Sequence, residues 1–221
     1  VARGTYTPSA GGGSGDDRLK TFQLKNGVTV LGGYPNGGGT EEQRDPAAHV
    51  CTLSGDLDGD GELNAGNCYQ VFYHPATTAL DATAVLDGFV ITGGNANGQN
   101  PHHCGGGMYN DGSSPTVRNC VFAGNNASWD GGGVLTRNST TGFSNCEFRN
   151  NSSDGRGGGL SGTSSTIGLA DCTFTDNVAV SEGGGARVWN SGPCVIENCT
   201  FSSNNAFRGG GISAGDSTIL L

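Results

Sequence analysis

A repeat of 26 residues constrains this chain more than any other feature of its sequence. Apolar residues stand three positions into each repeat, a Cys-x-Phe pair follows, and an asparagine comes three positions after the phenylalanine. Repeats of this length are typical of solenoids, in which each repeat forms one coil that packs against the next. Triplets of glycine mark the period, beginning at Gly105, Gly131, Gly157, Gly183 and Gly209.

The composition indicates strands rather than helices. Glycine accounts for 42 of 221 residues and apolar residues for only 33%. The two-residue spacing of Cys-x-Phe is typical of a strand with one buried face, and each interior glycine would cost a helix about 1 kcal/mol. Like residues stacked about 4.8 Å apart let a narrow core suffice. We therefore predict an all-β solenoid of about 26 residues per coil, with three parallel sheets around one core.

The repeat can be followed upstream, where it becomes irregular. Residues 86–96 align with residues 117–127 if about five residues are inserted in the segment 97–104. We predict a single domain over 1–221, in which the coils are irregular with long loops up to residue 82 and regular over 83–221. Earlier strands are expected within residues 21–34, 50–55 and 69–73.

The sequence stops at Leu221, midway through a coil. An incomplete coil leaves an open sheet edge, which natural proteins usually cover. Either the protein continues, or another molecule stacks on this end. End-to-end association into a filament is therefore one expected form of partnership.

The charge and hydropathy of the chain exclude two classes of partner. A formal net charge of −9 and a pI near 4.7 argue against nucleic acid, because phosphate binding needs a basic surface. No stretch approaches the ~18 apolar residues of a membrane span, so we expect no membrane span in this chain. The first residues also lack the basic-then-apolar pattern of a signal peptide.

The repeats resemble those of a known family of bacterial surface proteins. The run GGGMYNDGSSPTVRNCVFAGNNAS, with its later copies around NCEFRNN and DCTFTDN, is similar to the repeats of polymorphic outer-membrane proteins. The upstream segments resemble bacterial proteins that carry varied C-terminal anchors. The resemblance implies a right-handed parallel β-helix and an exported or surface-attached protein, often an adhesin or passenger domain. Here the glycine motif is mostly GGG followed by an apolar residue, a departure from the family's GGA.

The segment DLDGDGELNAGN is a candidate calcium loop. Its carboxylates stand at loop positions one, three and five and its glycine at position six, a spacing at which oxygens converge on a hard cation. It resembles the loop of dockerin-type modules, although an asparagine stands where a terminal acid is expected, which should weaken binding. The alternative is a solvated acidic turn. The candidate ligands for a structural Ca²⁺ are Asp56, Asp58, Asp60, Glu62 and Asn67.

Cys51 and Cys68 bracket this loop and are a candidate disulfide. On the chain-entropy estimate the bond would add about 3 kcal/mol, and export would permit it. The alternative is two buried thiols. Cysteines that keep the 26-residue phase are expected to form a ladder of inward free thiols, since stacked side chains rarely offer disulfide geometry. These are Cys120, Cys146, Cys172 and Cys199.

The remaining cysteines and the histidines give weaker signals. Cys104 and Cys194 lie outside the column and could each pair with a neighbour. His102 and His103 beside Cys104 suggest a zinc site, but no second ligand cluster stands at metal spacing, so a polar loop is the simpler interpretation.

The expected function is a non-catalytic extracellular or cell-surface scaffold, such as an adhesin, a passenger segment or a filament-forming protein. Its outward side chains would meet a glycan or another cell-surface ligand, and no catalytic residue is predicted. The alternative is a carbohydrate-active enzyme, such as a calcium-dependent polysaccharide lyase with Lys20, Lys25 or Arg44 as the base. The outward residues expected on the surface are Tyr109, Arg137, Arg187 and Trp189.

Overall fold

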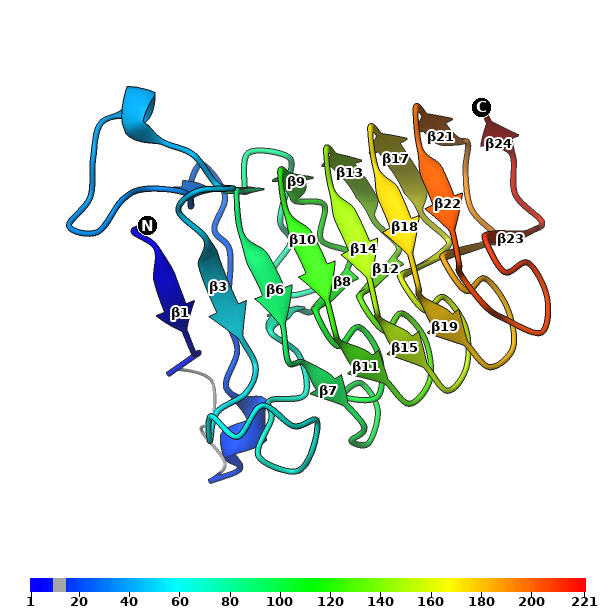
Figure 1. The fold of residues 1–221 in the computed structure, drawn as a ribbon. Coiled ribbons are helices and arrows are strands. Elements are labelled where there is room, and N and C mark those ends of the chain that lie inside the picture. Colours follow the sequence, from blue (N-terminus) through cyan, green and yellow to red (C-terminus); the bar gives the residue numbers. More distant parts are fainter. Residues whose placement is uncertain (10–14) are drawn as a thin grey trace.

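The computed structural model describes residues 1–9 and 15–221, and it is a stack of coils wound along one axis (Figure 1). The two ends of the chain lie at opposite ends of the stack. Two single turns of 3-10 helix, η1 (Asp17–Leu19) and η2 (Glu41–Gln43), lie in the N-terminal loops. No helix in the described part of the chain is long and apolar enough to cross a membrane.

The strands of the described residues form four sheets, and every strand pair is parallel. Sheet one contains β1 (Gly4–Tyr6), β3 (Cys51–Ser54), β6 (Val90–Thr92), β10 (Val121–Ala123), β14 (Glu147–Arg149), β18 (Thr173–Thr175) and β22 (Thr200–Ser202). Sheet two contains β2 (Thr29–Leu31), β5 (Val85–Asp87), β9 (Thr116–Arg118), β13 (Thr140–Ser144), β17 (Thr166–Ala170), β21 (Cys194–Glu197) and β24 (Ile219–Leu220).

The other two sheets complete each coil. Sheet three contains β4 (Phe72–His74), β8 (Met108–Asp111), β12 (Val134–Arg137), β16 (Leu160–Thr163), β20 (Ala186–Trp189) and β23 (Ile212–Gly215). Sheet four contains β7 (Asn95–Ala96), β11 (Asn126–Ala127), β15 (Ser152–Ser153) and β19 (Val178–Ala179). The expectation of three sheets is therefore corrected to four in the described residues. Strands of two residues are too short to show a period in the sequence.

The register confirms the predicted stacking of like on like. Phe122 pairs with Phe148, which pairs with Phe174, and Phe174 pairs with Phe201 although the spacing there is 27 residues. Their rings stack along the axis, with centroids 5.2, 4.4 and 4.6 Å apart. The all-β parallel β-helix predicted from the repeat is confirmed.

A ladder of buried asparagines runs beside the phenylalanines, as the sequence predicts. Asn125 donates from Nδ2 to Oδ1 of Asn151 over 3.1 Å, Asn151 donates to Asn177 over 3.0 Å, and Asn177 donates to Asn204 over 2.9 Å. Each amide also donates to a backbone carbonyl of the preceding coil. Buried amides satisfied in this way fix the turn without cost to the narrow core.

The glycine triplets are explained by two different requirements. The first glycine has a left-handed backbone, with φ of +69° at Gly131, which favours a residue without a Cβ. At Gly132 and Gly133 a Cβ would overlap carbonyl oxygens of the next coil, Ser152 O and Gly159 O. The triplet therefore lets the chain turn and lets the coils approach each other.

The N-terminal coils carry long loops. Residues 33–50 and 56–67 leave the stack at opposite ends of β3. The insertion predicted at 97–104 follows β7 and packs against the outer face of sheet three, where Cys104 contacts Tyr109. These three loops shape the surfaces described next.

Candidate functional site

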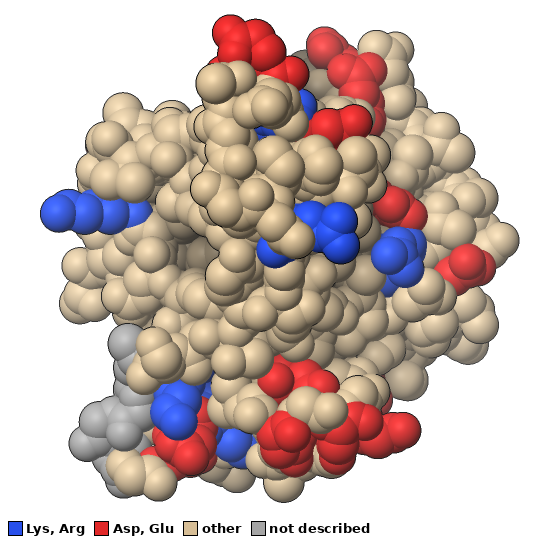
Figure 2. Space-filling view, turned by 60° about the vertical axis from the view of Figure 1, so that its left-hand side comes forward, with Lys and Arg blue, Asp and Glu red and all other residues tan. Residues whose placement is uncertain are grey.

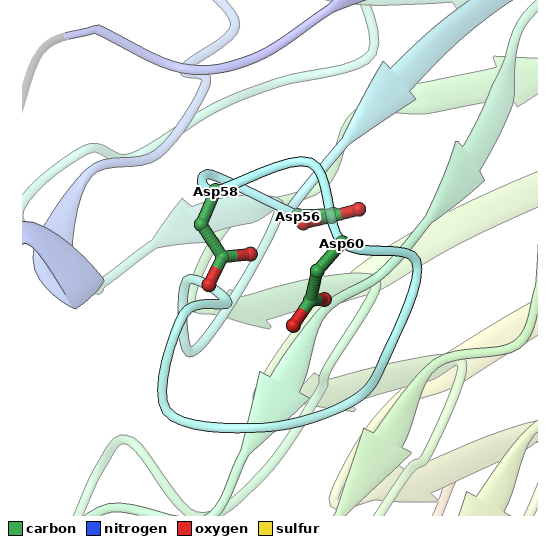
Figure 3. A group of neighbouring side chains, drawn as sticks. All are labelled: Asp56, Asp58 and Asp60. Atoms are coloured by element: carbon green, nitrogen blue, oxygen red, sulfur yellow. The ribbon is translucent and has the colours of Figure 1, made fainter.

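The acidic loop brings three of its five predicted ligands together. Carboxylate oxygens of Asp56, Asp58 and Asp60 all lie within 4.8 Å of one another, and among the described residues no basic side chain pairs with them. Figure 3 shows the carboxylates of Asp58 and Asp60 extending in the same direction, within the outline of the loop. Asp58 lies so close to Gly66 that a Cβ there would overlap its carboxylate. The loop therefore presents convergent oxygens of the kind that bind Ca²⁺.

The pKa values of two of these carboxyl groups are shifted in opposite directions. Desolvation raises the pKa of Asp58, and the neighbouring carboxylates of Asp56 and Asp60 raise it further. Desolvation acts in the same direction on Asp56, but the backbone N–H groups of Gly61 and Gly59 outweigh it, and the pKa of Asp56 is lowered. A cation would relieve the repulsion that acts on Asp58.

The other two predicted ligands are placed differently. Glu62 lies outside the group of three and is exposed. Asn67 is buried, and its Oδ1 accepts the N–H of Asn64 at 2.8 Å while its Nδ2 donates to Gly93 O at 2.9 Å. Asn67 therefore closes the loop and ties it to the coil that contains Gly93. Because its side-chain oxygen already accepts a hydrogen bond within the loop, the structure does not support Asn67 as a metal ligand.

Arg18, which sequence reasoning missed, fastens the N-terminal segment to the base of this loop. Its guanidinium donates to Asn67 O at 2.8 Å, to Asn95 O at 2.9 Å and to Asn97 Oδ1 at 2.8 Å, and it lies over the ring of Tyr69. A lone arginine in an irregular segment carries no periodic signal, so only the fold reveals this role.

The predicted Cys51–Cys68 disulfide is wrong for this structure. Both residues are buried free thiols, and they lie at opposite ends of β3, because Cys68 N–H bonds to Gly55 O. Four residues of strand separate Cys51 from Gly55 by about 13 Å, so Cys68, which is bonded to Gly55, lies beyond the reach of a disulfide from Cys51. Cys104 and Cys194 are also free among the described residues.

The cysteine column forms the predicted ladder of free thiols. Cys120, Cys146 and Cys172 are buried and Cys199 is half-buried. Burial raises the pKa of Cys120 to about 12, so it is an apolar packing group rather than a nucleophile.

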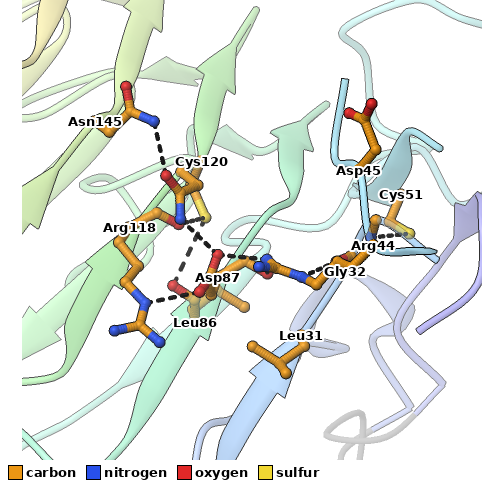
Figure 4. A network of polar contacts seen from close by, with 12 residues as sticks. Leu31, Gly32, Arg44, Asp45, Cys51, Leu86, Asp87, Arg118, Cys120 and Asn145 are labelled. Atoms are coloured by element: carbon orange, nitrogen blue, oxygen red, sulfur yellow. Dashed lines mark hydrogen bonds and ion pairs between the residues drawn. The ribbon is translucent and has the colours of Figure 1, made fainter. Parts of the chain in front are cut away.

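A groove of about 630 Å³ lies across several coils, where sheet two turns into sheet one. The loop after η2 forms one wall, and Arg44 fastens it. The guanidinium donates to Gly32 O at 2.7 Å and to Asp87 Oδ1 at 2.5 Å, and Asp87 also accepts from Arg118 at 2.7 Å and from Asn119 at 2.8 Å (Figure 4). Burial alone would raise the pKa of Asp87, but these donors outweigh it and lower the pKa.

A row of polar side chains lines the groove at intervals of one coil. The row consists of Asn119, Asn145 and Asp171, which all have left-handed backbones. Asn145 donates from Nδ2 to Asn119 Oδ1 at 2.7 Å. Asp171 takes the third place, where a carboxylate cannot donate to Asn145. Asp171 Oδ1 instead accepts from Asn198 Nδ2, one coil further along, at 3.3 Å, so among the described residues no side-chain hydrogen bond joins Asn145 to Asp171. Glu147 and Thr173 stand beside them in the same groove.

The groove and the acidic loop are separate, whereas the lyase alternative would need its Ca²⁺ beside the groove. Cys51, at the start of β3, lines the groove, while the loop begins after the end of that strand. Of the three basic residues considered as a base, Arg44 is bonded to Asp87 and Lys20 pairs with Asp17 at 2.8 Å. Figure 2 shows acidic side chains gathered at the upper and lower edges of the N-terminal face, with mostly uncharged surface between them.

Two of the four side chains expected on the surface are covered. Tyr109 and Arg187 point outward from sheet three, yet they are only 2% and 5% exposed. The insertion 97–104 covers the first, and the glycine turn before β20 lies against the second, where a Cβ at Gly183 would meet Cβ of Arg187. Arg137 and Trp189 are partly exposed, as expected.

The insertion does not form the zinc site considered above. His102 bonds to Gln70 at 2.9 Å and stacks on Tyr69, and burial raises the pKa of Cys104 to about 12. Within the ranges 1–9 and 15–221, the acidic loop is the one group of three or more metal-binding side chains. The insertion is a packing element.

These features define a parallel β-solenoid that carries an oxygen-rich loop and a lateral polar groove. The family model described as "Right handed beta helix region" matches residues 73–220. This match covers more than half of the chain, and the chain belongs to that family. Neither the curated proteins nor the solved structures compared with the chain include a match.

Proposed function

We propose that this protein is a non-catalytic extracellular or cell-surface scaffold that binds an extended glycan in its lateral groove. The observation that carries the proposal is the row of Asn119, Asn145 and Asp171, repeated at the spacing of the coils. At the step between Asn145 and Asp171 the row of side-chain hydrogen bonds is interrupted among the described residues, and both side chains are exposed. Hydroxyl groups of a glycan would supply donors there, since a few placed polar groups fix the orientation of a ligand in a pocket.

The surface location is proposed from the resemblance of the repeats to polymorphic outer-membrane proteins and to surface proteins with varied anchors. A repeated core with loops on the outside suits an adhesin or passenger segment, because loops can vary without disturbing the stack. Ca²⁺ is proposed as a structural ion of the loop. Asp56, Asp58 and Asp60 would hold it, and its charge would offset theirs.

The glycan proposal is tested on an array of extended neutral and acidic glycans. We expect binding to be weakened by Asp171→Asn, because an amide at this place restores the donor and continues the ladder from Asn145. Asp176→Asn, an exposed left-handed position outside the groove, is the matched control. Equal binding by wild type and Asp171→Asn would contradict the proposal.

The second candidate is a carbohydrate-active enzyme, favoured by the presence of Glu147 and Asp171 in one groove. Two carboxylates on one groove are the usual requirement of glycoside hydrolysis. Incubation with acidic and neutral polysaccharides, with and without Ca²⁺, separates the two. Unsaturated or reducing-end products that disappear in Glu147→Gln would replace the scaffold proposal by the enzyme.

End-to-end association is proposed as a further property of the scaffold. The strands β22, β23 and β24 each have a neighbour on one side only, so their outer backbone groups can pair with a second copy. Sedimentation and electron microscopy over a range of concentrations test this. Monomers alone at the highest concentration would exclude it.

A further inference from the structure

The turns that lead from sheet four to sheet three expose several large apolar side chains. Sheet four lies along one edge of the solenoid, from β7 to β19 (Figure 1). Trp129 is 55% exposed and Phe207 is 81% exposed, and Val178 and Val180 are exposed in the coil before Phe207. Over residues 84–210 only two other large apolar side chains are exposed. Apolar surface gathered in one place on a soluble protein usually marks a contact with another molecule.

Charged residues of alternating sign stand in the same turns, one in each of four successive coils. Backbone bridges join Asp130 to Arg156, Arg156 to Glu182 and Glu182 to Arg208, so the four residues form a row along the axis. Neighbours in this corner row stand about 4.8 Å apart, and the row is about 14 Å long. It begins with an acid and ends with a base.

The two ends of the corner row are incompletely matched within the chain. Asp130 is half-buried, forms no ion pair with a described residue, and has its Oδ1 buried without a hydrogen-bond partner. Desolvation raises the pKa of Asp130, and the charges of Arg187 and Arg156 offset this rise only in part. At the other end, the Arg208 side chain is 71% exposed, and its 3.7 Å contact with Glu182 is longer than a hydrogen bond. Asp130 can therefore take a cation, and Arg208 can take an acid.

A second copy of the chain satisfies both ends at once if the two rows lie antiparallel. With a two-fold axis midway between Arg156 and Glu182, Asp130 faces Arg208 of the second copy, and Arg156 faces its Glu182. Every facing pair then has opposite signs, and the contact is closed because the same patch serves both copies. A parallel copy in register, or an antiparallel copy displaced by one coil, would instead bring like charges together, which is costly.

The residues beside the charges fit the same symmetry. The residues that directly precede the four charges are Trp129, Gly155, Ser181 and Phe207, so large side chains stand at both ends of the row and small ones in the middle. The antiparallel copy therefore brings each tryptophan to a phenylalanine, a favourable aromatic contact. Val180 stands in a coil next to the two-fold axis, so the Val180 side chains of the two copies lie about 5 Å apart along the axis.

We propose that this corner binds a second copy of the chain in an antiparallel dimer, in which Asp130 of each copy pairs with Arg208 of the other and Trp129 packs against Phe207. The contact is lateral and uses side chains, so it is distinct from end-to-end association through strand edges. It shares no residue with the polar groove, which stays open in the dimer. A contact along one corner is smaller than the ~1,200 Å² at which stable interfaces begin, so the dimer is reversible and depends on protein concentration.

Charge reversal at the two ends of the row tests the dimer by sedimentation equilibrium. Asp130→Arg sets bases against bases at both ends of the dimer, and Arg208→Glu sets acids against acids. Each variant alone should raise the dissociation constant of the dimer at least about tenfold. In an equimolar mixture of the two variants every facing pair again has opposite signs, so a heterodimer should form with about the affinity of the wild type. A variant that failed to fold would not be rescued by mixing.

Two further variants complete the test. Phe207→Ser removes an exposed side chain without touching the core and should also weaken the dimer. Arg149→Glu is the matched control, because Arg149 likewise contacts an acid of its own chain but lies in β14, away from this corner. It should leave the dissociation constant unchanged. Monomers alone at the highest concentration of wild type, an undiminished dimer in Asp130→Arg, or no heterodimer in the mixture of folded variants would overturn the proposal.

Discussion

At the scale of single residues, His74 shows how a polar side chain is placed inside a core this narrow. The imidazole is fully buried; its Nε2 accepts Leu24 N–H at 3.1 Å, so Nδ1 carries the proton that it donates to Asn110 Oδ1 at 2.8 Å. Both ring nitrogens are used, and the neutral ring joins the N-terminal segment to the coils. Burial lowers the pKa of His74 to about 4.

This pKa predicts a loss of stability in weak acid. The folded value lies below the unfolded value of about 6.5, so the contribution of His74 is complete above pH 6.5 and declines as the pH falls to about 4. The two values differ by about 2.5 units, which corresponds to about 3 kcal/mol. Urea unfolding at pH 7 and pH 4 should show this difference in the wild type and less of it in His74→Gln. An identical pH dependence in both proteins would contradict the prediction.

The acidic loop gives a second prediction at this scale. Ca²⁺ at 100 times its dissociation constant should raise the free energy of unfolding by about 2.7 kcal/mol. Asp58→Asn should abolish this gain, because Asp58 belongs to the convergent group. Glu62→Gln should keep it, because Glu62 lies outside that group although the loop spacing suggests it as a ligand. Thermal unfolding with Ca²⁺ and with a chelator measures both, and loss of the gain in Glu62→Gln would show that the loop rearranges.

Sequence reasoning predicted single residues well only where the repeat fixed them. Asn151 and Phe148 occupy the positions that their columns predict. The predicted pairing of Cys51 with Cys68 failed because the two cysteines flank the acidic loop in the sequence, but strand β3 lies between Cys51 and the start of that loop. Asp87 was missed because its three donors come from distant segments, and no local pattern announces them.

At the scale of elements, the stacked phenylalanines distinguish the middle of the solenoid from its end. Phe148 lies between Phe122 and Phe174 and is fully buried, whereas Phe201 stacks on one ring only and is half-buried. The amount of contact that truncation removes therefore differs although the two positions are equivalent in the repeat.

We predict that Phe148→Ala destabilises the protein by about 3–5 kcal/mol, the range for a fully buried phenylalanine. Phe201→Ala should cost less than half as much, because the cavity left at the end of the row opens to solvent. Denaturant unfolding of the two variants makes the comparison. The measurement is made on monomeric protein at low concentration, so that no second molecule covers the last coil. Equal losses under these conditions would contradict the prediction.

The elements themselves were predictable to different degrees. The strands of sheets one, two and three carry inward apolar columns, and the sequence indicates them. Sheet four consists of residue pairs such as Asn126–Ala127, which are formed by the coils above and below rather than by any local preference. The outward direction of Tyr109 and Arg187 was also correct, but alternation along a strand cannot tell which outward side chains a loop covers.

At the scale of the whole molecule, the repeat predicts that a coil can be removed without loss of the fold. Deletion of residues 131–156 joins Asp130 to Gly157, and every column keeps its phase. Since each coil contacts only its neighbours, we expect an unchanged circular dichroism spectrum and a lower free energy of unfolding. A helical or disordered spectrum would contradict the prediction that one coil can be removed while the others keep their fold.

The same deletion has an electrostatic consequence. Along one corner the isolated bridges join Asp130 to Arg156, Arg156 to Glu182 and Glu182 to Arg208, so the charges alternate. Removing the coil that holds Arg156 places Asp130 directly against Glu182, and like charges in facing positions are destabilising. Glu182→Arg should therefore be more favourable in the shortened protein than in the full chain by about 1 kcal/mol. Equal effects in the two backgrounds would show that the row contributes nothing.

A cross-section that repeats gives the outside of the molecule a fixed pitch. Any side chain placed on a corner has its counterpart about 4.8 Å further along, as Asn119 and Asn145 show. Side chains on such a surface are evenly spaced along the axis. A partner whose own units recur at a commensurate distance would make the same contacts at every coil, while a partner with a different spacing would lose those contacts after a few units.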